Sequence, residues 1–291
     1  MPANFRNKRL YAYSLLLINS VLWGFSPPII KYSLQFITPT TFLFFRYLLA
    51  TLLYFPIFLI YKNSNHHKIN VKHHLSIALL GTPLTLLPLF YGLSITNSID
   101  SSILESSSPI FVILGGLVYL KEKVTPKEWL GTIIALSGSL FLISQPAISS
   151  GTNNQTILGN LLIVLSNIIW ASFLLLSKKD HTDPVYLSFF SYLLSVPFFL
   201  FVSLISNNHL SLHPLSMPGV FYMAVFGSIT AFWAYQKAQQ YVEASEAAIF
   251  SYLKPVFTIP LAYYWLHESF TKQDLIAIAL ILLGVYISEK K

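Results

Sequence analysis

The chain has 291 residues, of which 54% are hydrophobic and 10% are charged, and its formal net charge is +7. Soluble domains hold roughly 25% charged residues, so this composition excludes a water-soluble globular protein and indicates an all-α integral membrane protein in a lipid bilayer. Cysteine is absent, which excludes disulfides and thiolate chemistry. The basic residues lie in short clusters between apolar runs, as topology signals do, so nucleic acid is not an expected partner.

Turn residues and charges divide the chain into ten apolar segments, each expected to be a membrane-spanning helix. In chain order they are residues 10–31, 40–61, 75–95, 99–119, 128–144, 157–177, 184–206, 218–236, 246–265 and 274–288. The first segment resembles a signal peptide at its start, but it is longer and lacks an A-x-A cleavage site, so we expect it to be retained. The fifth and tenth segments are the shortest.

The lysine and arginine residues predict how these segments are oriented. A cytoplasmic N-terminus places most of them on the cytoplasmic side: Arg6, Lys8, Arg9, Lys62, Lys68, Lys72, Lys121, Lys123, Lys127, Lys178, Lys179, Lys237, Lys290 and Lys291. Of the 18 in the chain, only Lys31 and Lys272 fall on the outer side, whereas Arg46 and Lys254 fall within spans. Because cytoplasmic loops are enriched in positive charge, both termini are predicted to be cytoplasmic.

The second half of the chain resembles the first at a shift of about 146 residues. The aligned pairs include Trp23 with Trp170, Lys31 with Lys178, FFRYLL from Phe44 with FFSYLL from Phe189, and Pro109 with Pro255. Each half holds five spans, an odd number, so the second must run upside down relative to the first. We therefore predict two inverted five-helix repeats, residues 1–147 and 148–291, an arrangement typical of secondary transporters.

The clearest match between the halves is a pattern that opens the fifth and tenth spans. Glu122, Thr125, Gly131 and Gly138 align with Glu268, Thr271, Ala277 and Gly284. Thr125, Pro126 and Glu128 have the spacing of a helix N-cap with a capping box, and Thr271 with Asp274 offers a similar arrangement. Asp100 and Glu246 open the fourth and ninth spans, where carboxylates favour the positive end of the helix dipole.

Arg46 and Glu105 are charged residues inside predicted spans. Each lies about six residues from the outer face, or about 9 Å deep at the rise of a helix, so the two side chains could meet. Charges in a bilayer usually face a partner or a water-filled cavity, although Arg46 is long enough to snorkel to the outer headgroups. Burial would favour the protonated form of the Glu105 carboxyl group, whereas a nearby Arg46 would favour its ionised form. The sequence therefore leaves open whether Glu105 couples transport to protons.

Lys254 lies in the middle of the ninth span, directly before Pro255 and close to Tyr252. Snorkelling is least plausible at that depth. We expect the ammonium group to point into a cavity, where it could hold a carboxylate or phosphate of a substrate or replace a coupling ion. A structural ion pair with Glu105 is the alternative.

Aromatic residues near the middle of several spans suit an amphipathic organic substrate. Trp23, Trp170 and Trp233 lie beside amide side chains, and Tyr91 lies in the third span. For each of these residues alone, helix packing explains its position as well as ligand contact does. His66, His67, His73 and His74 lie together in a basic loop without a carboxylate, which favours a headgroup-facing surface over a metal site. No metal or cofactor is expected.

The chain resembles the drug/metabolite transporter superfamily, specifically its EamA-like family, over essentially its full length. The repeated E-x2-T-x5-G/A-x6-G pattern, the NSVLWG and SNIIWA segments, and Pro109 with Pro255 carry the resemblance. It implies ten helices in two inverted bundles, with a cavity lined by the first four helices of each half and the fifth and tenth at the periphery. Members of the family move amino acids and their derivatives, polyamines, nucleotide precursors and toxic compounds, and many bacterial members are exporters.

The expected function is secondary transport of small organic metabolites, such as amino acids or their derivatives, by an exporter or exchanger in a bacterial inner membrane, acting as a monomer or homodimer. A multidrug or polyamine exporter of the same family is the nearest alternative. A membrane-embedded enzyme or a non-transporting scaffold is the alternative from another class. The sequence holds no P-loop, HExxH or GxSxG motif, so neither ATP use nor hydrolytic catalysis is indicated.

Overall fold

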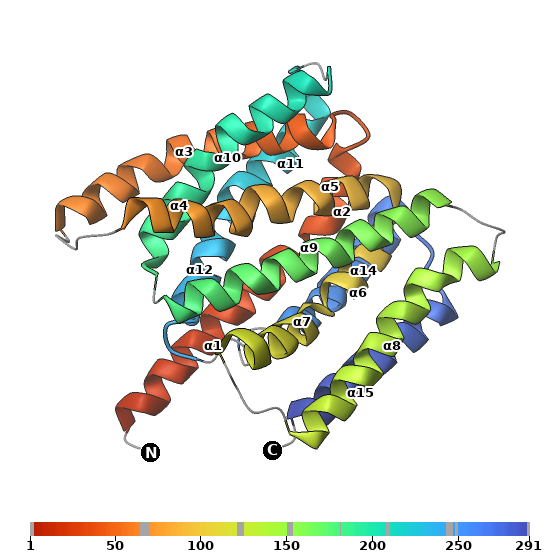
Figure 1. Ribbon diagram of the computed structural model, residues 1–291. Helices are drawn as coiled ribbons and strands as arrows, with labels where there is room; N and C mark the ends of the chain where they lie inside the picture. The colour runs from red at the N-terminus through yellow and green to blue at the C-terminus, as the bar shows by residue number, and fades with distance from the viewer. Residues whose placement is uncertain are drawn as a thin grey trace.

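The computed structural model describes residues 3–64, 70–120, 125–149, 154–180, 182–207, 210–242, 247 and 250–289. Several residues named from the sequence lie outside this description: His66, His67, Lys68, Lys121, Glu122, Lys123, Glu246, Lys290 and Lys291, and the side chains of Arg6 and Glu128. All regular secondary structure in the described part of the chain is helical (Figure 1). The all-α prediction is therefore confirmed for these residues.

The first half contains α1 (Ala3–Gly24), α2 (Ser26–Ser33), α3 (Pro39–Ser64), α4 (Val71–Leu79), the π-helical segment η1 (Leu80–Leu84), α5 (Thr85–Ile95), α6 (Ser98–Glu105), α7 (Ser108–Gly115), the π-helical segment η2 (Gly116–Leu120) and α8 (Pro126–Ser149). The second half contains α9 (Asn154–Lys179), α10 (Pro184–Ile205), the 3-10 turn η3 (Pro214–Ser216), α11 (Met217–Tyr222), the π-helical segment η4 (Met223–Thr230), α12 (Ala231–Ala238), the 3-10 turn η5 (Phe250–Leu253), α14 (Lys254–Leu266) and α15 (Lys272–Glu289).

Seven helical stretches in the described residues are long and apolar enough to cross a membrane. They are Lys8–Ser33, Pro39–Ser64, Val71–Ile95, Ser98–Tyr119, Asn154–Lys179, Pro184–Ile205 and Pro214–Ala238. The segments predicted as the fifth, ninth and tenth spans are also helical, as α8, α14 and α15, but they are not among the seven. The protein is thus an integral membrane protein, and its count of ten spans stays a prediction.

Side chains that bind free backbone amides begin several of the helices. Asn97 accepts the Asp100 amide at the start of α6, and Asp183 accepts two amides at the start of α10. Thr271 and Asp274 bind each other's amides before α15, with Asp274 Oδ2 2.7 Å from the Thr271 amide, so the predicted capping arrangement is confirmed there. Local sequence therefore determines where these helices begin.

Glu268, from the repeated E-x2-T pattern, binds a different helix from the one it precedes. Its carboxylate accepts the Ser98 amide at 3.0 Å, the Ser98 hydroxyl at 2.6 Å and the Ile99 amide at 3.1 Å. It therefore caps the positive end of α6 from the segment between α14 and α15. The pattern thus joins the two halves of the chain.

Breaks interrupt the fourth and ninth helical stretches at equivalent places, just before Pro109 and Pro255. Proline lacks a backbone N–H and disturbs the preceding turn of a helix, where backbone carbonyl groups can then accept hydrogen bonds from side chains of other helices. Asn167 Nδ2 donates to the Leu104 carbonyl at 2.7 Å, and Ser20 Oγ donates to the Phe250 carbonyl at 2.8 Å. In each case a side chain from one half of the chain binds the broken helix of the other.

Segments far apart in sequence pack against each other throughout the bundle: α3 against α10, α5 against α9, α1 against α12, and α8 against α15. In Figure 1, α8 and α15 lie side by side at the lower right. The approach of α5 to α9 is especially close at Gly92 and Gly159, where a β-carbon on Gly92 would lie 2.6 Å from the Gly159 carbonyl oxygen. Small residues permit this contact.

Candidate functional site: a cavity between the two halves

A cavity with a solvent-reachable volume of about 80 Å³ lies in the middle of the bundle. Among the residues predicted from the sequence, its lining includes Trp23, Arg46, Glu105, Trp170 and Lys254. These residues come from α1, α3, α6, α9 and α14, so both halves of the chain form the cavity. The predicted residues Tyr91, Trp233 and Tyr252 are not part of its lining.

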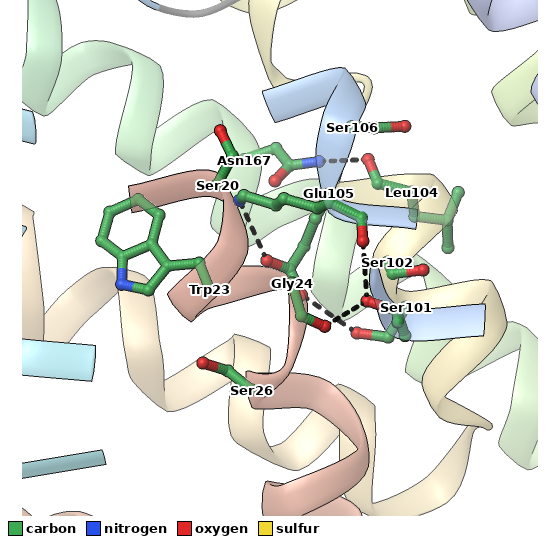
Figure 2. Close-up of polar contacts among 12 residues, drawn as sticks. Ser20, Trp23, Gly24, Ser26, Ser101, Ser102, Leu104, Glu105, Ser106 and Asn167 are labelled. Atoms are coloured by element: carbon green, nitrogen blue, oxygen red, sulfur yellow. Dashed lines mark hydrogen bonds and ion pairs between the residues drawn. The ribbon is translucent and has the colours of Figure 1, made fainter. Parts of the chain in front are cut away.

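Glu105 and Lys254 form an ion pair at the cavity wall. Lys254 Nζ lies 3.3 Å from Glu105 Oε2, and the side chains are 8% (Lys254) and 14% (Glu105) exposed. Ser101 Oγ donates to Glu105 Oε1 at 3.3 Å from the preceding turn of α6 (Figure 2). The ammonium group also lies 5.1 Å from the centre of the Trp23 ring, within range of a cation–π interaction. Lys254 therefore forms the ion pair that was the alternative and also lines the cavity, while its contact with a substrate stays a prediction.

The positions of these two charges are unfavourable within their own helices. Glu105 is the last residue of α6 and lies at the negative end of its dipole, whereas Lys254 is the first residue of α14 and lies at the positive end. Each charge therefore depends on the other rather than on its helix. Charges kept against local electrostatics usually mark a functional requirement.

Arg46, two turns into α3, is only 4% exposed, so its side chain is directed into the protein and not toward the membrane surface. Its Nε donates to Ser228 Oγ at 2.9 Å, and the guanidinium group lies 4.9 Å from the Tyr47 ring centre. Nη1 has no hydrogen-bond partner among the described residues. Arg46 and Glu105 line the same cavity, but they do not form the ion pair that their similar positions in the spans allowed: Glu105 pairs with Lys254 and Arg46 with Ser228.

The serine that replaces Arg46 in the second half is also buried at a helix crossing. Ser191, in the FFSYLL segment of α10, is 0% exposed, and its carbonyl accepts a hydrogen bond from Thr82 Oγ1 at 3.0 Å. Thr82 and Ser228 themselves align at the shift of 146 residues. The crossing between these helices is thus repeated in the two halves, but only the first half supplies a cation.

Two π-helical segments bring small residues to this cavity. η1 places Gly81 and Thr82 on the lining, and η4 places Gly227 there, with Ser228 beside Arg46. Wide turns of this kind are frequent at functional sites. Ser228 was not identified from the sequence. The signal that could have found it is the glycine followed by a hydroxyl residue at matching positions in the third and eighth spans.

Trp23 and Trp170, which occupy equivalent positions in the two halves, contact each other at the cavity. Their ring centres lie 5.5 Å apart in an edge-to-face arrangement. Trp23 Nε1 donates to the Gly227 carbonyl at 2.9 Å, which fixes the orientation of the indole ring. Both tryptophans therefore line the cavity, and their contact with a substrate stays a prediction.

The three remaining predicted residues lie elsewhere. Trp233 lines a separate pocket of about 530 Å³, together with Tyr61 and Asp183, which share a 2.6 Å hydrogen bond. Tyr252 is buried in an apolar cluster with Ile99 and Ile103. Tyr91 is partly buried in α5.

One of the four histidines that the sequence placed in a basic loop, His73, has a carboxylate partner that was not expected. His73 Nε2 lies 2.8 Å from Asp180 Oδ2 at the end of α9, so the view that no carboxylate accompanies these histidines is wrong for His73. Asp180 is more than a hundred positions away in the chain and therefore invisible to a local reading. Within the described residues, no group of three or more candidate ligands could hold a metal ion.

Known proteins resemble this chain along its whole length. The sequence profile of the EamA-like transporter family matches it twice, at residues 10–144 and 157–289. An uncharacterized transporter of Archaeoglobus fulgidus is 26% identical to this chain, and the alignment covers 95% of this chain and 96% of the relative. The uncharacterized transporter YyaM of Bacillus subtilis is 25% identical, and the alignment covers 88% of this chain and 86% of the relative. A solved crystal structure, 15% identical, shares the fold with a TM-score of 0.70 over 97% of this chain and 96% of its own. This chain belongs to the EamA-like transporter family.

Proposed function

We propose that the protein is a secondary transporter of small organic metabolites, such as amino acids or their derivatives, and that it exports or exchanges them through the central cavity by alternating access. The observation that carries this proposal is the set of three charged side chains, Arg46, Glu105 and Lys254, on the lining of an interior cavity within apolar helices. Such charges are costly in a bilayer and are kept where solutes pass. Membership of a transporter family supports the same conclusion.

The proposal includes ten membrane spans arranged as two inverted repeats of five. The family profile matches the two halves separately. The helix contacts also keep their pattern when the halves are exchanged, since α5 packs on α9 as α12 packs on α1, while α3 with α10 and α8 with α15 pair across the repeat. A site between two such repeats can open to either side of the membrane as the halves rock.

Two lysines support the same symmetry. Lys31 Nζ donates to the Leu93 and Ser94 carbonyls at 3.0 and 3.1 Å and also to the Thr96 carbonyl. Its aligned partner, Lys178, donates to the Gln239 and Val242 carbonyls, which occupy positions equivalent to Leu93 and Thr96. Each ammonium thus binds the negative end of a helix in its own half. Under the proposed topology, one of these contacts lies near each membrane face.

A polyamine or drug-cation exporter is less well supported by the lining. Among the described residues, Glu105 is the single acidic residue of the cavity lining, and its carboxylate already binds Lys254. A cationic substrate would have to displace the ammonium group and also approach Arg46. Charge repulsion in a site of low polarity disfavours both steps.

Transport would be tested with purified protein in proteoliposomes, by counterflow of labelled amino acids, their N-acylated forms, polyamines and nucleotide precursors. We expect saturable exchange of one class, and a loss of at least tenfold in rate for Lys254→Met. Lys62→Met, which removes an exposed lysine at the end of α3, is the matched control and should keep the full rate. The absence of exchange for every class would contradict the proposal.

The same preparation tests whether protons drive transport, for which Glu105 is the proposed carrier. Glu105→Gln should then abolish the response of transport to a pH gradient, because the amide cannot bind or release a proton in the physiological range. An unchanged response would favour facilitated exchange without proton coupling.

A further inference from the structure

The charged side chains that line the central cavity do not balance. Arg46 and Lys254 are cations, and Glu105 is the single carboxylate among the described lining residues. Glu105 is committed to Lys254 by their 3.3 Å contact. One positive charge, on Arg46, therefore remains without a counter-charge.

Arg46 is not neutralised from outside the cavity lining. It forms no ion pair among the described residues, and its contacts are the Ser228 hydroxyl and the faces of Tyr47 and Phe90. These contacts place and orient the guanidinium group but supply no full negative charge. A buried cation without a counter-charge is costly, so a protein tolerates it chiefly where a ligand supplies the missing charge.

The unfilled hydrogen-bonding capacity of the cavity points to the same place. Among the residues that the structure describes, the buried Arg46 Nη1 has no hydrogen-bond partner, and neither has the hydroxyl of Ser108, which is 2% exposed. Both residues line the cavity. Buried polar atoms in folded proteins almost always have a partner, and an oxyanion could accept a hydrogen bond from either of these donors.

Apart from some hydroxyl groups and the amide of Asn167, the rest of the lining is mainly apolar and aromatic. It includes Leu86, Leu89, Phe90, Leu93, Met223 and Phe232. Such a surface suits an aliphatic or aromatic body attached to the anionic group. Outside the Glu105–Lys254 pair, it offers no carboxylate for a free ammonium group among the described residues.

From this imbalance we infer that the cavity takes an organic monoanion: a substrate with one carboxylate, bound by Arg46, and an apolar body without a free ammonium group. The inference rests on the proposed transport function and narrows it to the derivatives of amino acids, such as N-acylated or 2-oxo acids, rather than the zwitterions themselves. A zwitterion would bring an ammonium group that competes with Lys254 for Glu105. A phosphate ester carries about two negative charges at neutral pH and would overcompensate a single cation.

Four probes with one carbon skeleton separate these charge classes: N-acetyl-L-leucine (monoanion), L-leucine (zwitterion), L-leucinamide (cation) and N-acetyl-L-leucinamide (neutral). Phenylpropionate and phenyl phosphate test an aromatic body with a carboxylate and with a phosphate.

Thermal unfolding of the detergent-solubilised protein reports binding, because a ligand of the native state raises the melting temperature. We expect both carboxylate monoanions to stabilise the protein at concentrations at least tenfold lower than any other probe. Equal or stronger stabilisation by leucine, leucinamide or phenyl phosphate would overturn the inference, and so would no stabilisation by either monoanion.

Arg46→Gln tests the assigned residue. It should weaken monoanion binding at least tenfold, whereas the melting temperature of the ligand-free protein should stay the same or rise, because an uncompensated charge has been removed. Lys62→Gln, which removes a positive charge at an exposed position of α3, should alter neither monoanion binding nor the melting temperature. A marked fall in the ligand-free melting temperature of Arg46→Gln would identify Arg46 as a structural residue and contradict the inference.

Failure of this inference and failure of the proposed function give different results. Exchange of leucine in proteoliposomes without any monoanion binding would refute the monoanion and leave transport intact. Monoanion binding that depends on Arg46, without exchange of any solute, would keep the site and refute transport.

Discussion

Glu105 and Lys254 show how a pair of residues can be costly one by one and stable together. Each charge opposes the dipole of its own short helix by about 0.3 to 1 kcal/mol, and each is largely withdrawn from solvent. That both charges lie inside the bundle could be predicted from the sequence, because each falls within an apolar segment. Their pairing could not, because it depends on how α6 and α14 are rotated toward each other. For the same reason the sequence suggested that Arg46 could meet Glu105, whereas in the structure Arg46 binds Ser228.

Removing one member of this pair should be more harmful than removing both. Lys254→Met leaves a buried carboxylate unpaired and should lower the free energy of unfolding by about 3 kcal/mol. The double variant Glu105→Gln with Lys254→Met should recover most of that loss, because no charge remains to be compensated. Thermal unfolding of the two single variants and the double variant gives the coupling energy directly. Additive losses would show that the two side chains do not interact.

At the level of elements, the structure adds the interruptions that create the cavity. Helix positions follow from apolar runs and turn residues, and caps such as Thr271 with Asp274 follow from local spacing. The π-helical segments η1 and η4 were not predicted, because apolar runs and turn residues do not distinguish a wide turn from an α-helical one. The proline positions were visible in the sequence, but the side chains that bind carbonyl groups of the two interrupted helices, Asn167 and Ser20, come from distant helices.

Substitutions at two glycines, Gly92 and Gly227, test whether the close approach of α5 and α9 stabilises the fold. Gly92→Ala would bring a β-carbon to 2.6 Å from the backbone oxygen of Gly159, and the helices would have to separate. We expect a loss of about 1 to 3 kcal/mol in unfolding free energy. Gly227→Ala is the matched control, because its β-carbon would meet the flexible end of Met223 at 2.6 Å, which can move aside. Equal losses in the two variants would contradict this account of the helix contact.

For the whole molecule, repetition within the sequence was the most informative signal. It aligned Trp23 with Trp170, and the two rings meet at the cavity. It also drew attention to the FFRYLL and FFSYLL segments, whose difference gives a cation to one of the two equivalent helix crossings and a serine to the other. The composition of the cavity wall, with Thr85, Ser166 and Phe232, depends on the assembled bundle and was not predicted.

The inverted arrangement can be tested directly because the native chain has no cysteine. Asn63→Cys lies near the end of α3 and Ser206→Cys at the end of α10, and both positions are exposed. If the two halves are inverted, a membrane-impermeant maleimide should label Ser206→Cys in intact cells and reach Asn63→Cys only after permeabilisation. Labelling of both positions from the same side would show that the halves run in parallel.

The lysines at positions 31 and 178 have a consequence for the protein's dependence on salt. Backbone carbonyls gathered at the end of a helix are a common way to coordinate Na⁺ in transporters. Here the carbonyl groups at the ends of α5 and α12 receive an ammonium group that belongs to the chain itself. The protein thus supplies a covalently attached cation of its own at each of these places, so we expect both helix ends to keep their charged partner when Na⁺ is removed from the medium.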